Sequence, residues 1–179
     1  MDRFVDHHNI SAVTRTCEGM GILNVHVISS DYLKNYAARS VTKNSDKWLN
    51  LHYYESAKEI LPILKENGYQ IWTAHLSKES TDLHKLHIPD KIALVLGSEK
   101  DGPSEDTKEL TDKFIYLPIH GFIESYNVSV ASALLLQLIK EKRTFNNLSE
   151  EIYLRTKHQY YLKSVKFADR LLNYHWKNN

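Results

Sequence analysis

The chain has 179 residues, of which 42% are hydrophobic and 25% charged, and its formal net charge is +1 at pH 7. That length suits one domain with a single sizeable core, and the composition is ordinary for a globular protein. A charge so close to zero gives no general attraction to nucleic acid, so any basic surface must be local.

The first predicted element is an amphipathic helix that begins near Asn9. Its apolar residues recur at helical spacing: Ile10, Val13, Cys17 and Met20. Asn9 or Ser11 can cap its start by accepting a hydrogen bond from a free amide of the first turn. Arg15 follows Asn9 by six residues, so the two side chains are expected on different faces of the helix.

Short apolar or β-branched runs predict five strands: residues 24–28, 51–53, 69–74, 92–96 and 114–117. Residues 55–67 predict an amphipathic helix, which Pro62 should kink or shift at its start. Residues 29–44 predict a loop with a short helix, and residues 78–89 predict a polar connection. Because strands alternate with helices, we expect an α/β fold with a mostly parallel sheet and helices on both faces.

An acidic turn bracketed by glycines follows the strand at 92–96, whose continuous apolar run is typical of a strand covered on both faces. Pro103 is expected in the first turn of the next helix. The turn is not a phosphate cradle, because Glu99 and Asp101 would repel phosphate. A carboxylate here suits a hydroxyl, an amino group or the edge of a base.

Residues 116–138 join the end of a strand, a polar loop and the start of a helix. Pro118 ends the strand, and Ser125 or Asn127 can cap the helix. Residues 128–139 are apolar on nearly every face, which predicts a buried helix. In open α/β sheets, ligands bind where strand ends and helix starts meet, so this corner is the predicted binding site.

A last helical region is predicted from Ser149 to Trp176, after a break at two asparagines. Its bases lie among aromatic residues: Lys157, Lys163, Lys166 and Arg170. Such pairs can stack on nucleotides, although docking on the body or on a second subunit is the more usual role of a terminal helix pair. We therefore expect residues 1–145 to form the main domain and residues 146–179 a C-terminal helical extension.

Three segments of this chain resemble the three motifs of the SpoU branch of the SPOUT RNA methyltransferases. Asn9 followed six residues later by Arg15 is similar to the first motif. Leu-Gly-x-Glu-x-x-Gly at residues 96–102 is similar to the second, and the run Ser-Tyr-Asn-Val-Ser-Val-Ala within residues 119–131 is similar to the third. Short motifs carry a risk of false positives, but three in the expected order are specific.

The resemblance covers the chain from Asp6 to Arg143, and residues 69–77 are similar to the TrmH group, the tRNA guanosine 2′-O-methyltransferases. It implies that the C-terminal part of the sheet is tied into a deep trefoil knot, whose loops bind S-adenosylmethionine. The cofactor-binding residues that it implies are Ala74, His75, Leu96, Gly97, Leu117, Ile119, Tyr126 and Asn127. It also implies a homodimer with each site close to the interface.

The implied reaction is methyl transfer to a ribose 2′-oxygen in RNA. The motif positions give these catalytic residues: Asn9, Arg15, Glu99, Ser125 and Asn127. Arginine stays protonated in proteins and is a poor base, so we interpret Arg15 as holding the adjoining phosphate and the developing alkoxide. The proton would leave through that phosphate or through an arginine in an unusual state, while Asn9 and Asn127 orient Arg15 or the nucleotide.

The expected RNA partner is tRNA, at its D-loop. The candidate RNA contacts are His8, Arg15, Arg39, Arg143, Lys163 and Lys166. Enzymes of the TrmH group carry a basic helical segment before the first motif, and this chain has almost nothing there. The remaining candidates for the grip on tRNA are Lys140, Lys142 and Arg143 at the end of the buried helix, and the bases of the C-terminal helices.

Other functions were weighed against this one. Ribosomal RNA and the tRNA wobble position are the competing substrates, and a non-catalytic knotted RNA-binding module is the alternative outside enzymes. A dinucleotide-binding enzyme is excluded, because no Gly-x-Gly-x-x-Gly follows an early strand. No histidine pair has the spacing of a metal site, so no metal is expected. Cys17 is the only cysteine, which fits the reducing cytoplasm, and neither DNA nor a membrane is an expected partner.

Overall fold

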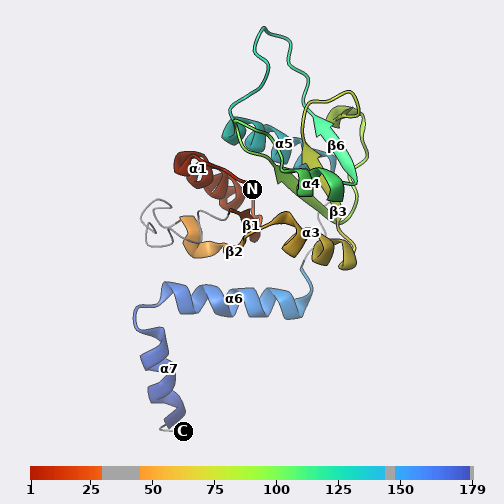
Figure 1. The fold of residues 1–179 in the computed structure, drawn as a ribbon. Helices are drawn as coiled ribbons and strands as arrows, with labels where there is room; N and C mark the ends of the chain where they lie inside the picture. The colour runs from red at the N-terminus through yellow and green to blue at the C-terminus, as the bar shows by residue number, and fades with distance from the viewer. Residues whose placement is uncertain (30–44, 144–147, 178–179) are drawn as a thin grey trace. The chain divides into compact units, whose positions relative to one another are not determined.

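The computed structural model describes residues 1–29, 45–143 and 148–177 (Figure 1). The expectations for residues 30–44, including Arg39, lie outside the described residues. The chain divides into two compact units, residues 1–144 and residues 145–179, and each unit is described by itself.

The first unit is built on strands that all pair in parallel. They are β1 (Asn24–Ile28), β2 (Asn50–Tyr54), β3 (Gln70–Ala74), β4 (Thr81–Asp82), β5 (Ile92–Leu96) and β6 (Lys113–Tyr116). β1 pairs with β2, and the other four lie in the order β4-β6-β3-β5. Parallel pairing confirms the α/β class, because each strand needs a crossover connection before its parallel neighbour.

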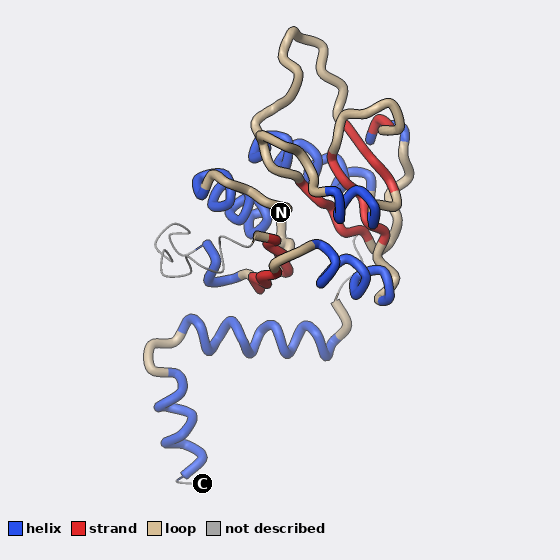
Figure 2. The backbone as a smooth tube through the Cα atoms, viewed as in Figure 1, coloured by secondary structure: helices blue, strands red, loops and turns tan. Residues whose placement is uncertain are grey.

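Helices cover both faces of the strands. α1 (His7–Gly19) and α5 (Val128–Lys142) pack on one face, and α3 (Ala57–Glu66) and α4 (Glu105–Leu110) pack on the other. Side chains alternate along β3, so that Trp72 joins the core beneath α1 and α5 while Ile71 joins the core beneath α3. Figure 2 shows α4 and α5 on opposite sides of the larger sheet.

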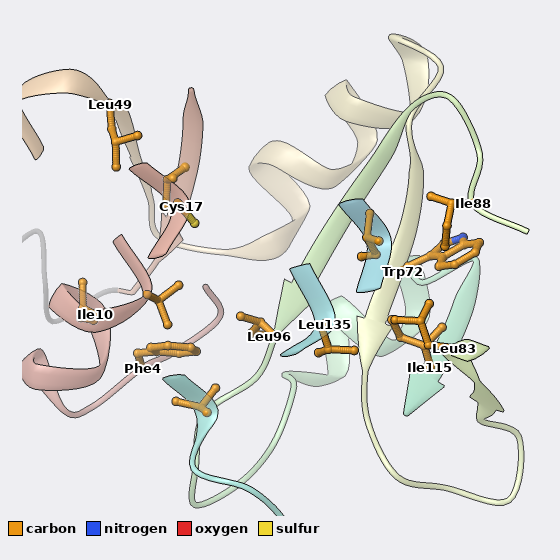
Figure 3. Close-up of a cluster of buried hydrophobic side chains, with 14 residues drawn as sticks. Phe4, Ile10, Cys17, Leu49, Trp72, Leu83, Ile88, Leu96, Ile115 and Leu135 are labelled. Carbon is orange, nitrogen blue, oxygen red and sulfur yellow. The ribbon is translucent and has the colours of Figure 1, made fainter. Parts of the chain in front are cut away.

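The larger core runs without a break from α1 to the far edge of the sheet. In Figure 3, Phe4, Ile10, Cys17 and Leu49 form one end of it, and Trp72, Leu83, Ile88 and Ile115 form the other. Leu96 and Leu135 lie between them. Burial raises the pKa of the Cys17 thiol to about 11, so Cys17 packs as an uncharged core residue.

Asp2 and Arg3, at the start of the chain, together join the two sheets. The amide of Asp2 donates to the carbonyl of Leu96 at 2.8 Å, and the amide of Arg3 donates to the carbonyl of Ile28 at 2.8 Å. The Asp2 side chain is fully buried, and its Oδ2 accepts from the amide of Ser104 at 2.7 Å. Asp2 therefore ties the end of β1 to the end of β5 and to the turn that follows β5.

Two predicted helix starts are corrected or resolved. Asp6, rather than Asn9 or Ser11, caps α1, and its side chain accepts from the amide of His8. Asn127, rather than Ser125, caps α5. The prediction that Pro103 lies in the first turn of the next helix is wrong, because α4 begins only after its cap at Ser104.

The prediction that residues 128–139 are buried on nearly every face is also wrong. Val128, Leu135 and Ile139 are buried, but Val130 and Leu134 are 47% and 44% exposed. Only one side of α5 meets the sheet, so its opposite side presents apolar residues to solvent within this unit.

The connection at residues 78–89 is less simple than predicted. It contains the short strand β4, which pairs with β6, and a 3-10 turn, η3 (Leu83–Lys85). Leu83 and Ile88 are buried in the larger core. A few apolar residues scattered in a polar run give no periodic signal, which is why the sequence pattern indicated a plain connection.

The remaining described elements are short or terminal. A 3-10 turn, η2 (Ser45–Trp48), precedes β2, and Pro62 lies inside α3. The second unit contains α6 (Glu150–Ser164), capped by Ser149, and α7 (Ala168–Lys177), and α6 buries none of its residues. None of the described helices has the length and apolar character needed to cross a membrane.

The pair of strands β1 and β2 is expected to respond to acid. The His26 ring stacks on His52 with ring centroids 4.9 Å apart, and burial, with a contribution from His52, lowers the pKa of His26 from 6.5 to about 4. The unfolded chain takes up this proton near pH 6.5 and the folded chain only near pH 4. The free energy of unfolding should therefore fall as the pH drops through that window. Urea unfolding across pH 4–7 should show a shallower pH slope for His26→Phe, and equal slopes would contradict this assignment.

Gly97 is expected to tolerate no side chain. An ideal Cβ there would lie 2.2 Å from the Pro103 nitrogen and 2.4 Å from the Gly102 carbonyl carbon, both of them backbone atoms. Gly97→Ala should lower the free energy of unfolding by roughly 1–3 kcal/mol, as for other substitutions that overpack a site. Gly121→Ala is the matched control, because a Cβ at Gly121 meets nothing within 4 Å. Chemical denaturation measures both, and similar stabilities of the two variants would refute the prediction.

Candidate active site

A cavity of about 430 Å³ opens at the carboxyl ends of β3, β5 and β6. Its walls come from the three loops that follow these strands and from the start of α5. All eight residues expected to bind the cofactor line it: Ala74, His75, Leu96, Gly97, Leu117, Ile119, Tyr126 and Asn127. In Figure 1 the longest of the three loops, between β6 and α5, extends away from the sheet. The cavity lies where parallel α/β sheets bind their ligands.

The floor of the cavity is apolar and its walls are rich in backbone. Ile115 and Leu135 are buried beneath it. Two hydrogen bonds fix the turn after β3, because the amide of His75 donates to the Ile115 carbonyl at 3.0 Å and Ser80 Oγ donates to the His75 carbonyl at 2.6 Å. Burial, with a contribution from Lys108, lowers the pKa of His75, which favours its uncharged imidazole.

A chain of side-chain hydrogen bonds links the three sequence motifs at this cavity. Asn127 Nδ2 donates to Asn9 Oδ1 at 3.2 Å, and Asn9 Nδ2 donates to Glu99 Oε1. These contacts bring together residues that are 118 and 90 positions apart. Asn127 Oδ1 in turn accepts from the amide of Ser129 at 2.9 Å and from Ser129 Oγ at 2.6 Å.

The donor and acceptor order of these hydrogen bonds follows from the cap of α5. Because Asn127 Oδ1 accepts from the first turn of the helix, its Nδ2 must face Asn9. Asn9 then accepts with its oxygen, so its own Nδ2 faces Glu99. An amide side chain can accept with its oxygen while it donates with its nitrogen. Asparagine therefore suits both positions.

Arg15 does not line the cavity. It lies exposed on α1, whereas Asn9 on the same helix is buried. Six residues correspond to about one and two-thirds turns of helix, so the two side chains leave α1 in different directions. Ser125, the fifth expected catalytic residue, lines the cavity from the loop before α5.

The expected RNA contacts are dispersed. His8 is exposed at the start of α1. Arg143 Nη2 donates to the carbonyl of Asp90, so this side chain is held against the connection before β5. Lys163 and Lys166 belong to the second unit, where Lys166 Nζ lies 5.2 Å from the centre of the Phe167 ring. Their role in binding RNA stays a prediction.

Lys142 has a structural role that its position at a helix end did not predict. Its Nζ donates to three backbone carbonyls in and after η3: Leu83 at 3.2 Å, His84, and Leu86 at 2.9 Å. Together with the bond from Arg143, these contacts attach the end of α5 to the connection between β4 and β5.

Ten lining residues were not singled out as site residues from the sequence, although Leu76, Ser98 and Glu124 lie in the loops expected to bind the cofactor. They are Leu76, Ser98, Gly102, Pro103, Ile115, Tyr116, Glu124, Val128, Ala131 and Leu135. Most of them are apolar or backbone-rich positions without a chemical signal of their own. Glu124 is the exception, because it stands beside Ser125 in the predicted loop and carries a charge. Among residues 1–29, 45–143 and 148–177, no group of three histidine, cysteine or acidic side chains is arranged to hold a metal ion.

This chain is similar to known proteins over most of its length. Residues 1–137 match the family described as the SpoU rRNA Methylase family. A protein named tRNA (guanosine(18)-2′-O)-methyltransferase from Borreliella burgdorferi is 36% identical over 172 residues, which cover 92% of this chain and 78% of that protein.

Solved structures show the same fold. The crystal structure described as the A. aeolicus TrmH/SpoU tRNA modifying enzyme matches with a TM-score of 0.78 and 31% identity, over 92% of this chain and 87% of that one. The SpoU methyltransferase AviRb from Streptomyces viridochromogenes, solved in complex with the cofactor AdoMet, matches with a TM-score of 0.67 and 18% identity, over 79% of this chain and 58% of that one. The match over residues 1–137 and the 36% identity agree with the three motifs that meet at the cavity. The chain therefore belongs to the SpoU rRNA methylase family.

Proposed function

We propose that this protein transfers a methyl group from S-adenosylmethionine to the ribose 2′-oxygen of guanosine 18 in the D-loop of tRNA, the nucleotide in the name of its Borreliella burgdorferi relative. The observation that carries the proposal is the hydrogen-bonded chain from Asn127 through Asn9 to Glu99 at the mouth of the cavity. It joins all three family motifs at one place.

The cavity fits the cofactor. Its volume of about 430 Å³ lies within the roughly 300–1,000 Å³ usual for small-molecule sites. The apolar floor suits a purine ring, and the backbone of the three loops supplies amides and carbonyls for its polar edge. When bound, S-adenosylmethionine supplies an electrophilic methyl group on a positively charged sulfur.

The hydrogen-bonded residues and Arg15 would then position the attacking hydroxyl. The amide chain holds Glu99 with one carboxylate oxygen bound to Asn9, so its direction at the mouth is fixed. Arg15 remains cationic and would bind the phosphate beside the target ribose and the alkoxide as it forms. The hydroxyl proton would leave through that phosphate. Holding the two reactants in line is the main contribution asked of the protein.

We also propose that the chain is knotted and works as a homodimer. The strand order β4-β6-β3-β5 supports a knot, because β6 follows β5 in sequence yet lies between β3 and β4. Lys142 and Arg143 further hold α5 to the connection between β4 and β5. Val130 and Leu134 on the exposed side of α5 support a second copy as the partner that covers them.

The grip on tRNA is proposed to come from local basic surface, since the bulk charge of +1 is too small to attract RNA. In the second unit, Lys157 Nζ lies 5.6 Å from the Tyr153 ring centre and 5.9 Å from that of Tyr161. A lysine beside exposed aromatic rings can bind phosphates, while the rings can stack on unstacked nucleobases. Because tRNA is the substrate, the cytoplasm is the proposed location.

The direct test is methylation of unmodified bulk tRNA with labelled S-adenosylmethionine, followed by mapping of the modified nucleotide. We expect one 2′-O-methylguanosine in the D-loop. Label at the wobble position, or only in ribosomal RNA, would replace the proposed substrate. Absence of transfer to any RNA by a chain that binds the cofactor would favour the non-catalytic RNA-binding module.

Arg15→Lys separates geometry from charge. The lysine keeps the positive charge but loses the planar fork that can bind phosphate and alkoxide together. We expect the methylation rate to fall at least about a hundredfold, as when one transition-state donor is removed. Affinity for S-adenosylmethionine should be unchanged, because Arg15 does not line the cavity. Near-normal turnover in this variant would remove Arg15 from the mechanism.

Charge reversal tests the second unit. Lys163→Glu with Lys166→Glu should weaken tRNA binding at low salt and leave S-adenosylmethionine binding intact. For the unaltered chain, we expect log Kd to rise with log salt with a shallow slope of roughly three to five, since each phosphate contact adds about one. Filter binding across a salt series measures both quantities. Unchanged tRNA affinity in the double variant would assign α6 and α7 to packing alone.

A further inference from the structure

We propose that Glu124 makes the cavity select for a ligand that is positively charged at sulfur, so that the cofactor is favoured over its neutral product. This inference rests on the proposed function. It adds a specificity-determining residue that lies outside the chain of hydrogen bonds between the motifs.

The first observation is the charge of the cavity. Among its twenty lining residues, all of them described, Glu99 and Glu124 are the only ones that carry a formal charge, and no lysine or arginine is present. The lowered pKa of His75 favours its uncharged form. Two carboxylates therefore line the cavity, with no lysine or arginine among the lining residues to balance them.

The second observation is that the two carboxylates differ in how they are held. Glu99 is bound by Asn9 and so belongs to the polar chain between the motifs. Glu124 is exposed and lies in the loop between β6 and α5, next to Ser125, which also lines the cavity. A carboxylate at this place acts on a bound ligand mainly through its charge.

Ligand charge is what methyl transfer changes. S-adenosylmethionine carries a positive charge at sulfur, while S-adenosylhomocysteine is an uncharged thioether there and is otherwise the same molecule. A carboxylate close to the sulfur favours the charged ligand over the neutral one even in bulk water, and more strongly where water is excluded. Glu124 would thus hold the cofactor and weaken the hold on the product after transfer, which favours exchange of one for the other.

Two other roles for Glu124 predict different outcomes. A carboxylate that binds the amino group of the methionine moiety would favour both ligands equally, because both carry that group. A carboxylate that faces RNA would repel phosphate, so its removal would strengthen tRNA binding without changing the affinity for either ligand.

The experiment is calorimetric titration of the whole chain with three ligands at low salt. S-adenosylmethionine and sinefungin are cationic at the reacting position, because sinefungin carries an amine there, and S-adenosylhomocysteine is neutral. In Glu124→Gln we expect the affinity for both cationic ligands to fall roughly three- to tenfold, with that for S-adenosylhomocysteine unchanged. The loss should shrink in high salt, since the carboxylate is exposed.

Glu66→Gln is the matched control. Glu66 is an exposed carboxylate at the end of α3 that does not line the cavity, so all three affinities should remain those of the unaltered chain. Equal losses for all three ligands in Glu124→Gln, or no loss for any of them, would overturn the inference. Binding of S-adenosylmethionine by the unaltered chain tests the proposed function separately, because that result does not depend on Glu124.

Discussion

The amide of Asn9 is the contact on which the candidate site depends. It is a buried polar group, and burial is tolerated because both ends of the amide are bonded, one to Asn127 and the other to Glu99. A single side chain therefore fixes the start of α1, the turn after β5 and the cap of α5 in one arrangement. Breaking either bond would leave a buried donor or acceptor unpaired, which costs about 1–3 kcal/mol. Stability and site geometry are thus coupled through one residue.

The sheet places the parts that this contact joins. In a parallel sheet all strands end at the same edge, so the loops after β3, β5 and β6 are neighbours without any further device. Asp2 and Arg3 extend the arrangement to β1, because the amide of Arg3 binds the end of β1, while the amide of Asp2 binds the end of β5 and the Asp2 carboxylate holds the amide of Ser104 beyond the turn. The turn that carries Glu99 is therefore held at Leu96, before it, and at Ser104, after it.

Much of this arrangement was predictable from sequence, and the failures have physical causes. The strands at 24–28 and 92–96 have the predicted bounds, since the alternating β-branched run of the first and the continuous apolar run of the second each end at turn signals. All eight expected cofactor positions line one cavity because loop positions follow from strand ends. The exposed side of α5 was missed, since a run of leucines gives no sign of which side meets the sheet. The bond between Asn9 and Glu99 was out of reach, because pairing between residues 90 positions apart leaves no periodic trace.

The three carbonyls held by Lys142 have a consequence for how the chain can vary. An ammonium group has three donors, and here all three go to the backbone in and after η3. The segment between Leu83 and Leu86 therefore has a fixed length and curvature around the Lys142 ammonium group. An insertion or deletion within it would misplace at least one carbonyl, whereas Lys78 and Glu79 are exposed and lie outside both this segment and the cavity. Natural length variation in this connection should consequently accumulate before β4. A loop grafted onto this scaffold by design should be inserted there as well.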